Sequence, residues 1–343
     1  MSGLTYESVG VSFKAQEEAI KRIKRLVEST YTEGVLSGLG SFGGLFKLQG
    51  YEEPVLVASV DGVGTKLKVA FMMDKHDTVG RDLVAHCGND IAVQGARPLF
   101  FLDYIGCGKL SPRTVEGIVS GLAEGCREIG CALLGGEMAE MPGFYNEGEY
   151  DLVGFIVGVV ERSKAITGSG IEPGDVIIGL PSSGLHTNGY TLARKALFEI
   201  AGYKVDDFIP ELGCTVGEEL LKVHRSYVKQ ILTLMERVRI KGAAHITGGG
   251  LPDNLSRILP KGCRAVVRRG SWREPPIFGL IQRIGRVSDE EMFHVFNMGV
   301  GLCLVVSRDQ AEEAMEALRG MGEEPSLIGE IEEGNGEVRI VGG

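Results

Sequence analysis

The sequence predicts a mixed α/β (α+β) protein built from two layered sheet-and-helix domains. Apolar patterns typical of strands alternate with patterns typical of helices in both halves of the chain. The length of 343 residues exceeds what one hydrophobic core usually needs. The segment Thr167–Gly174 (TGSGIEPG) gathers three glycines and a proline between patterned segments, as linkers do. We therefore expect one domain over residues 1–168 and a second over residues 169–343.

The first elements of the chain are a helix and two strands. Apolar residues recur with helical spacing over Glu17–Glu28, which predicts an amphipathic helix. A glycine-rich stretch, Gly38–Gly44, follows it. Two short runs then have strand character, Gly44–Gln49 and Val55–Val60.

The clearest helix of the first half covers Pro112–Ile129. Ser111 is placed to cap it, Pro112 suits its first position, and Gly130 suits its end. Its apolar residues form one stripe at i, i+3, i+4, i+7 spacing. Strands are predicted after it at Cys131–Leu134 and Leu152–Val160.

The second half repeats the alternation of strands and helices. The predicted strands are Asp175–Leu180, Ala243–Thr247, Gly299–Ser307 and Leu327–Ile331. The predicted helices are Leu192–Ala201, a long amphipathic helix over Val216–Val238, a short one after the glycines at 248–250, and Asp309–Gly320.

Composition excludes several classes of protein. A formal net charge of −10 argues against binding to nucleic acid, which normally needs a basic surface. The seven cysteines are odd in number and form no CxxC pair, which favours free thiols in a reducing cytosol. No apolar stretch reaches the length of a membrane span, and no signal peptide is visible, so we expect a cytoplasmic location and no membrane partner.

The segment SVDGVGTK (Ser59–Lys66) combines a carboxylate, two glycines, a hydroxyl and an ammonium group at the end of a predicted strand. These groups could hold a metal ion beside a phosphate chain. The order of residues differs from a P-loop, in which Gly-Lys-Ser/Thr opens a helix. The segment is therefore a different kind of nucleotide loop, or no nucleotide loop. Its candidate ligands are Asp61, Gly62, Gly64, Thr65 and Lys66.

Three acidic residues in glycine-flanked segments are candidate Mg²⁺ ligands: Asp61, Asp90 in HCGNDIAVQGA, and Glu137 in LLGGEMAEMPGFY. Carboxylate oxygens and substrate phosphates are the usual ligands of Mg²⁺. Each acid alone is more often a cap or a solvated residue, and only their combination favours a metal site. Lys66 and Lys24 could contact phosphate oxygens. Lys66 could equally be a lysine in water at the edge of a strand, and a solvated helix face is the favoured interpretation of Lys24.

His186 in SSGLHTNGY and His245 in AAHITGGG are the best candidates for acid–base work. Both follow predicted strands in segments rich in glycine, where a ligand finds backbone N–H groups. The alternative for each is a structural histidine that caps a turn. We interpret His76, His224 and His294 as surface or packing residues and leave His86 open. The spacings typical of zinc hydrolases and serine hydrolases are absent from the sequence.

Ten segments, in order along nearly the whole chain, resemble those of the phosphoribosylformylglycinamidine cyclo-ligase family. They are TYESVGV (Thr5–Val11), GLGSFGG (Gly38–Gly44), SVDGVGTKLKVA (Ser59–Ala70), GRDLVAHCGNDIAVQGA (Gly80–Ala96), FFLDY (Phe100–Tyr104), GGEMAEMPGFY (Gly135–Tyr145), GFIVGVVE (Gly154–Glu161), SSGLHTNGYTLARK (Ser182–Lys195), HITGGG (His245–Gly250) and FNMGVG (Phe296–Gly301). The resemblance implies ATP-dependent closure of formylglycinamidine ribonucleotide to 5-aminoimidazole ribonucleotide. It also implies two α/β domains and a homodimer in which the N-terminal sheets pair.

The resemblance implies a role for each candidate residue. The N-terminal domain would bind ATP and Mg²⁺, and the C-terminal domain would bind the substrate. The implied metal ligands are Asp61, Asp90 and Glu137, and the implied phosphate contacts are Lys24, Gly62, Gly64, Thr65 and Lys66. Two further assignments are hypotheses: Ser182, Ser183, His186 and Asn188 would contact the substrate, and His186 or His245, with Asp90, would be catalytic.

Two departures from the family pattern and three alternatives accompany this assignment. The chain has GVSFK (Gly10–Lys14) where the family carries an acid, and HVFN (His294–Asn297) where it carries an arginine.

The alternatives are selenophosphate synthetase, thiamin-monophosphate kinase and an inactive nucleotide-binding regulator. The first would need a reactive cysteine where Ser41 stands, the second lacks the GGEMAEMPGFY and SSGLHTNGY runs, and the third would have lost the acids and glycines.

Overall fold

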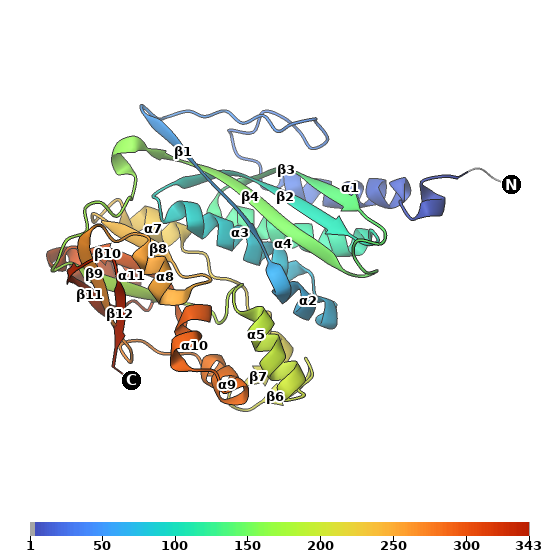
Figure 1. Ribbon diagram of the computed structural model, residues 1–343. Coiled ribbons are helices and arrows are strands. Elements are labelled where there is room, and N and C mark those ends of the chain that lie inside the picture. The colour runs from blue at the N-terminus through green and yellow to red at the C-terminus, as the bar shows by residue number, and fades with distance from the viewer. Residues whose placement is uncertain (1–3, 343) are drawn as a thin grey trace. The chain divides into compact units, whose positions relative to one another are not determined.

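The computed structural model describes residues 4–342, which form two compact units (Figure 1). The first unit comprises the chain up to Ile91 together with Pro98–Glu161. The second comprises Ala92–Arg97 and the chain from Arg162 onward. Each unit combines one main β-sheet with helices, so the mixed α/β class expected from the sequence is confirmed.

The first unit contains a four-stranded sheet in the order β1-β4-β2-β3, with helices along one face (Figure 1). The β1–β4 pair is antiparallel and the β2–β3 pair is parallel. The elements are α1 (Phe13–Glu28), β1 (Pro54–Gly62), α2 (Leu67–Met73), α3 (Asp77–Ala92), β2 (Arg97–Cys107), α4 (Pro112–Ile129), β3 (Ala132–Glu140) and β4 (Tyr150–Glu161).

Local capping explains where the helices begin and end. The Ser111 side chain accepts the Thr114 N–H, Pro112 occupies the first turn, and Gly130 ends α4 with φ of 74°. The predicted helix Pro112–Ile129 is therefore confirmed at both ends. Helix α1 begins at Phe13, one turn before the predicted start, because Ser12 caps it by accepting the Ala15 N–H.

Helices α3 and α4 approach each other until their backbones touch. A Cβ built on Gly121 would lie 2.1 Å from the Asp77 carbonyl oxygen, and one on Gly80 would lie 2.3 Å from the Ile118 carbonyl oxygen. Two glycines on facing helices therefore set the separation of this pair. This contact fixes the depth at which α3 lies against the sheet.

The second unit is built on a six-stranded sheet in the order β12-β9-β11-β5-β10-β8. The strands are β5 (Val176–Pro181), β8 (Gly242–His245), β9 (Gly262–Arg268), β10 (Val300–Val306), β11 (Ser326–Gly334) and β12 (Val338–Val341), and a separate hairpin pairs β6 (Phe208–Ile209) with β7 (Cys214–Thr215). The helices are α5 (Tyr190–Arg194) with a π-helical continuation (Lys195–Ile200), α6 (Val216–Leu220), α7 (Val228–Leu234), α8 (Gly250–Ser256), α9 (Pro276–Gly285), α10 (Asp289–Val295) and α11 (Ala311–Gly320).

The topology of this sheet brings two loops together. Strands β5 and β8 both pair antiparallel with β10, one on each side of it. They therefore run in the same direction, and their carboxyl ends lie at the same edge of the sheet. The amino end of β10 lies between those two ends. Loops that leave β5 and β8 must therefore meet beside the start of β10.

Two predicted elements are wrong. The run Gly44–Gln49 forms no strand and contributes only an isolated bridge between Phe46 and Val35. The predicted helix Val216–Val238 is two short helices, α6 and α7, separated by residues 221–227. The apolar spacing continues through this break, but the Ser183 hydroxyl donates to the Val223 carbonyl, which a continuous helix would use internally.

The state of the cysteines and the presence of membrane-spanning helices can both be compared with the structure. All seven cysteines are free, and six of them are buried. Within residues 4–342, we find no helix with the length and apolar character that a membrane crossing requires.

Replacing Gly121 with alanine is expected to destabilise the first unit by at least about 2 kcal/mol, because the methyl group would overlap the Asp77 backbone. Gly117 on the same helix is the matched control, since its Cβ would meet nothing closer than 3.4 Å. Alanine there should be neutral or stabilising by up to about 1 kcal/mol. Denaturant unfolding of both variants measures the difference, and equal stabilities would contradict the proposed close contact.

Candidate functional site

One face of α3 carries three ionisable side chains at intervals of one helical turn: Asp82, His86 and Asp90. Residues four apart lie on the same side of a helix, so these side chains form a single row. We call this row the α3 polar face. Each member contacts a residue of β1 or of the turn after it. The pairs are Lys66 Nζ–Asp82 Oδ1 at 2.9 Å, His86 Nε2–Asp61 Oδ2 at 3.1 Å, and Ser59 Oγ–Asp90 Oδ2 at 3.0 Å.

Strand geometry explains why β1 meets the α3 polar face. Ser59 and Asp61 are two residues apart, so their side chains point to the same side of the sheet. Asp61 pairs with Gly154 of β4. A Cβ on Gly154 would lie 2.2 Å from Phe101 and 2.8 Å from Leu83 of α3, so this glycine leaves room for the helix. The predicted candidates Asp61 and Asp90 therefore lie on the same polar row.

His86, which the sequence left open, is the central member of this row. Burial alone lowers the pKa of an imidazole, but the hydrogen bond and the charge of Asp61, together with the charges of Asp90 and Asp82, raise the pKa of His86 above its ordinary value. A protonated His86 neutralises part of the acidic cluster. The spacing Asp-x₃-His-x₃-Asp within a helix was the sequence signal that could have identified it.

Lys66 is fully buried and pairs with an equally buried Asp82. Burial lowers the pKa of Lys66, and the adjacent Asp82 carboxylate opposes that shift. The alternative of a lysine in water does not hold in this structure. Its Nζ is already engaged, so a phosphate contact would require this ion pair to open.

The other predicted phosphate contacts are more accessible. Gly64 and Thr65 are exposed in the turn after β1, and Gly64 has a φ of 69° that suits glycine. A Cβ on Gly62 would meet no atom closer than 3.6 Å, so its backbone is open to approach. Lys24 lies on the exposed side of α1, with its Nζ 3.9 Å from Glu28.

Glu137 lies on β3, at the opposite edge of the sheet from β1. Three strand spacings correspond to about 14 Å of sheet width. Glu137 is exposed on the wall of a cavity of about 490 Å³, which is also lined by α1, the glycine-rich segment Gly38–Gly44, and β2. The structure thus brings Asp61 and Asp90 together and places Glu137 elsewhere on the same unit.

Asp103 of β2 is a second carboxyl on the wall of this cavity. Asp103 as a whole is partly accessible from the cavity, but its carboxyl group is surrounded by protein atoms. This burial raises the pKa of Asp103 to about 7. A Cβ on Gly136 would lie 2.3 Å from Asp103 Oδ1, so the glycine of the GGE motif makes space for the carboxyl.

In the second unit, Asn297 joins the loop after β5 to the start of β10. Its Oδ1 accepts the Ser182 hydroxyl at 2.9 Å and the Gly299 N–H at 2.8 Å, and its Nδ2 donates to the Gly184 carbonyl at 2.9 Å. These bonds use most of the capacity of one buried amide. They fix the SSG turn that carries the predicted substrate contacts Ser182 and Ser183.

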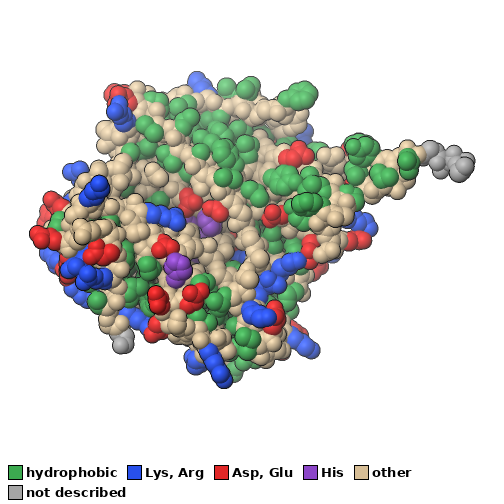
Figure 2. Space-filling view, viewed as in Figure 1, with side chains coloured by type: hydrophobic (Ala, Val, Ile, Leu, Met, Phe, Trp, Pro, Cys, Tyr) green, Lys and Arg blue, Asp and Glu red, His purple; other side chains and the backbone are tan. Residues whose placement is uncertain are grey.

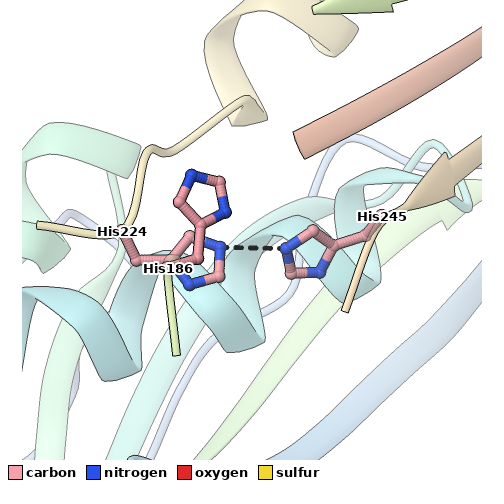
Figure 3. Close-up of side chains that lie close together, drawn as sticks. All are labelled: His186, His224 and His245. Atoms are coloured by element: carbon pink, nitrogen blue, oxygen red, sulfur yellow. Dashed lines mark hydrogen bonds between the residues drawn. The ribbon is translucent and has the colours of Figure 1, made fainter. Parts of the chain in front are cut away.

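Three histidines meet beside this turn (Figure 3): His186 after β5, His245 at the end of β8, and His224 from the break between α6 and α7. All three are buried. The Nε2 atoms of His224 and His245 are 2.9 Å apart, and the rings of His186 and His224 stack with centroids 4.0 Å apart. We call these residues the histidine cluster.

Neighbouring groups orient the rings of the cluster. The Ser183 N–H donates to His186 Nε2 at 3.1 Å, and Thr187 Oγ1 lies 3.2 Å from His224 Nδ1. His186 also has a positive φ of 61°, which costs energy for a non-glycine residue and is typical of functional positions. Asn188, another predicted substrate contact, lies near Gly248 of the second loop, whose Cβ would be 3.4 Å from Asn188 Oδ1.

From the sequence we interpret His224 as a surface or packing residue, and it lies within the predicted helix Val216–Val238. The structure buries it between the two histidines that the sequence did single out. The segment LKVHRSY has no glycine or proline that would have marked the break. The break therefore depends on a tertiary contact, the hydrogen bond from the Ser183 hydroxyl to the Val223 carbonyl.

The raised pKa of Asp103 predicts a pH-dependent stability. A carboxyl whose folded pKa lies above its unfolded value binds more protons in the native state, so stability falls as pH rises from about 4 to 7. Asp103→Asn should remove this loss and be more stable than the parent by about 2–4 kcal/mol at pH 8, with little difference near pH 3.5. Denaturant unfolding at both pH values tests this, with exposed Asp206→Asn as control; a pH-independent difference would contradict it.

Family models and related proteins place this geometry in context. The AIR synthase related protein N-terminal domain model matches residues 43–160, and the corresponding C-terminal domain model matches residues 172–342. Among solved structures, thiamine-monophosphate kinase from Stenotrophomonas maltophilia K279a has a TM-score of 0.68 at 19% identity, covering 95% of this chain and 96% of its own. Hydrogenase maturation protein HypE in complex with ATP has a TM-score of 0.68 at 18% identity, covering 96% and 92%. These two likenesses show a shared fold.

Relatives with much higher identity carry one name. The phosphoribosylformylglycinamidine cyclo-ligase of Syntrophotalea carbinolica is 55% identical over 98% of both chains. That of Thermoanaerobacter sp. (strain X514) is 53% identical, over 98% of this chain and 99% of its own. The family resemblance seen in the sequence motifs is thereby confirmed, and the chain belongs to the phosphoribosylformylglycinamidine cyclo-ligase family.

Proposed function

We propose that this protein is a ligase of purine biosynthesis that converts formylglycinamidine ribonucleotide and ATP to 5-aminoimidazole ribonucleotide, ADP and phosphate. The observation that carries this proposal is identity of 50–55% to cyclo-ligases over nearly the full length of both chains. The thiamine-monophosphate kinase likeness, at 19% identity, supports the fold and no second function.

The reaction has two chemical steps. An amide-type oxygen is a poor leaving group, so the γ-phosphoryl of ATP is first transferred to the formyl oxygen of the substrate. The ring-forming nitrogen then attacks the activated carbon, and the C–O bond breaks as phosphate leaves. Such a phosphoryl transfer depends on positioning the reactants and neutralising their charge. Ring closure also releases protons, which need an acceptor.

In the first unit, we assign Asp61, Asp90 and Glu137 to Mg²⁺. Their oxygen donors are those that Mg²⁺ prefers, and Asp61 and Asp90 are only partly buried, so the residues fit the ion. Bound magnesium would neutralise phosphate charge. Because β1 and β3 are at opposite edges of the sheet, Glu137 serves a different ion from the Asp61–Asp90 pair within one chain.

The turn after β1 provides the phosphate contacts in this proposal. The Gly64 backbone and the exposed Thr65 hydroxyl offer donors to phosphate oxygens, and the Gly62 N–H would exchange its bond to Asp61 Oδ1 for one of them. Lys24 adds positive charge from α1. Lys66 reaches a phosphate only when it exchanges Asp82 for that anion, and otherwise its role is to hold the turn against α3.

In the second unit, the loops after β5 and β8 would bind the substrate. Ser182, Ser183 and Asn188 are assigned to the ribose phosphate in this proposal. The Ser182 hydroxyl donates to Asn297 and the Ser183 N–H donates to His186, so both would exchange these partners for phosphate oxygens on binding. His186 and His245 are the proton acceptors in this proposal, because they are the imidazoles that the two loops deliver to one place.

We also propose that the protein is a homodimer paired through the sheet of the first unit, and that it works in the cytosol, where its free thiols stay reduced. Figure 2 shows hydrophobic side chains gathered over the β1–β4 part of the molecule. Leu56 and Val60 are each 62% exposed and Phe155 is 38% exposed on the face turned away from α3. An apolar sheet face of this kind is typical of an interface.

Loss of a metal ligand tests the reaction. Asp61→Asn and Glu137→Gln should each lower the rate of ATP-dependent aminoimidazole ribonucleotide formation by at least about 100-fold, because the uncharged amide holds Mg²⁺ poorly. A coupled colour assay for the amine product measures the rate, with Asp206→Asn as control. A near-normal rate in either variant would remove that residue from the metal site, and absence of product from the parent protein would overturn the reaction itself.

Charge on the exposed sheet face tests the dimer. Leu56→Glu should raise the dimer dissociation constant by at least about 100-fold, equivalent to about 3 kcal/mol, because it buries a carboxylate in an apolar interface. Sedimentation of the purified protein measures this. Ile200→Glu, at a position that is 57% exposed in the second unit, is the control. A monomeric parent protein, or a dimer unaffected by Leu56→Glu, would contradict the proposal.

A further inference from the structure

The histidine cluster contains one residue that the proposed reaction does not use. His224 is buried at 1% exposure, with Thr187 and His245 at its two ring nitrogens. Its ligand nitrogen and those of His186 and His245 all lie within 4.8 Å of one another. Three imidazoles from three separate segments of the chain thus converge on one volume (Figure 3).

The donor set of the cluster selects a class of ion. Neutral imidazole nitrogens bind Zn²⁺, Co²⁺, Ni²⁺ and Cu²⁺, whereas Mg²⁺ and Ca²⁺ require oxygen ligands. Three histidines with one open position are also a known arrangement for zinc. The cluster therefore suits a transition-metal dication, in contrast to the oxygen donors assigned to Mg²⁺ in the first unit.

The distance between His224 and His245 is close to that of a metal-bound pair. With zinc–nitrogen bonds of about 2.0–2.1 Å and a tetrahedral angle, two ligand nitrogens are about 3.3 Å apart. The two Nε2 atoms are 2.9 Å apart in the structure, where a hydrogen bond joins them. A small outward tilt of the two rings would accommodate the ion in place of that proton.

The surroundings of His224 are compatible with the required tautomer. Thr187 Oγ1 lies 3.2 Å from His224 Nδ1, so Nδ1 can keep its proton while Nε2 faces the cluster. Metal-bound histidines typically have such a partner on the second ring nitrogen, and that partner fixes the orientation of the ring.

His186 completes the set after a change of side-chain conformation. In the structure its ring stacks on His224 and its Nε2 accepts the Ser183 N–H. Coordination exchanges that hydrogen bond for the ion. Gly301 allows the ring to occupy this place, because a Cβ there would lie 2.6 Å from His186 Cε1.

We propose that His186, His224 and His245 form a binding site for one transition-metal dication of the zinc type, with a fourth position open. Its nitrogen donors differ from the carboxylates assigned to Mg²⁺, and its occupancy does not depend on the ring-closure reaction. Because His186 and His245 are also the proposed proton acceptors, the metal-bound and the proton-accepting forms exclude each other.

Metal binding to the full-length protein tests this proposal. Protein freed of metal with a chelator should bind one equivalent of Zn²⁺ by calorimetry, and Co²⁺ should produce the visible absorption of a nitrogen-coordinated, four-coordinate ion. His224→Ala should weaken Zn²⁺ binding by at least about 100-fold, and Thr187→Val by about 10-fold, as expected for a ligand and for its outer partner. His294→Ala is the control, since His294 is exposed in the same unit and should leave binding unchanged.

A variant-independent measurement accompanies these titrations. X-ray absorption at the zinc edge of the parent protein should report nitrogen scatterers at about 2.0 Å from three imidazoles. The proposal is overturned if no saturable equivalent binds, if His224→Ala binds as tightly as the parent protein, or if the spectrum shows an ion surrounded by oxygen. The last two results would mean that the cluster is a hydrogen-bonded histidine pair only.

Discussion

The buried ion pair between Lys66 and Asp82 is the contact on which the first unit's site depends. Both side chains are completely inaccessible, so each is stable as an ion only while the other is present. The pair fixes the turn after β1 to one position along α3. Once Asp82 is held, the helical repeat places His86 one turn later against Asp61, and Asp90 a further turn later against Ser59. Loss of one buried partner, a change that typically costs about 3–5 kcal/mol, would therefore release the register of the whole row.

In the second unit, the directions of the strands bring the site residues together. Since β5 and β8 run the same way on either side of β10, the segments that leave them converge without any contact needing to pull them together. Asn297 then locks the first of these loops to the start of β10. The break between α6 and α7 adds His224 from outside the sheet. Strand topology thus brings the loops that carry His186 and His245 together. The Asn297 amide fixes the first loop, and the Ser183 hydroxyl fixes the segment that adds His224.

Local signals in the sequence predicted what local structure determines. Helix α4 was predictable to the residue because its cap, its apolar stripe and its terminal glycine agree. The candidates Asp61 and Asp90 were found from glycine-flanked motifs, and the row they share could have been recognised from the four-residue spacing on α3. The burial of Lys66 was not predictable, because its partner is 16 residues away and only tertiary packing excludes water from both. The same holds for His224, whose helix-like surroundings continue through a break that a distant serine maintains.

The arrangement of the acids limits what one chain can do with metal ions. Asp61 and Asp90 face the helices at the β1 edge, and Glu137 lies beyond two further strands, beside the cavity that also contains Asp103. Magnesium–oxygen bonds are about 2.1 Å long, so a single ion spans far less than the sheet width between these edges. The oxygen donors therefore define two places on the first unit. At one of them the adjacent Asp61 carboxylate raises the pKa of His86, whereas at the other burial raises the pKa of Asp103 to about 7. The two ends of the same sheet thus offer different electrostatic surroundings, one set by ion pairing and the other by desolvation.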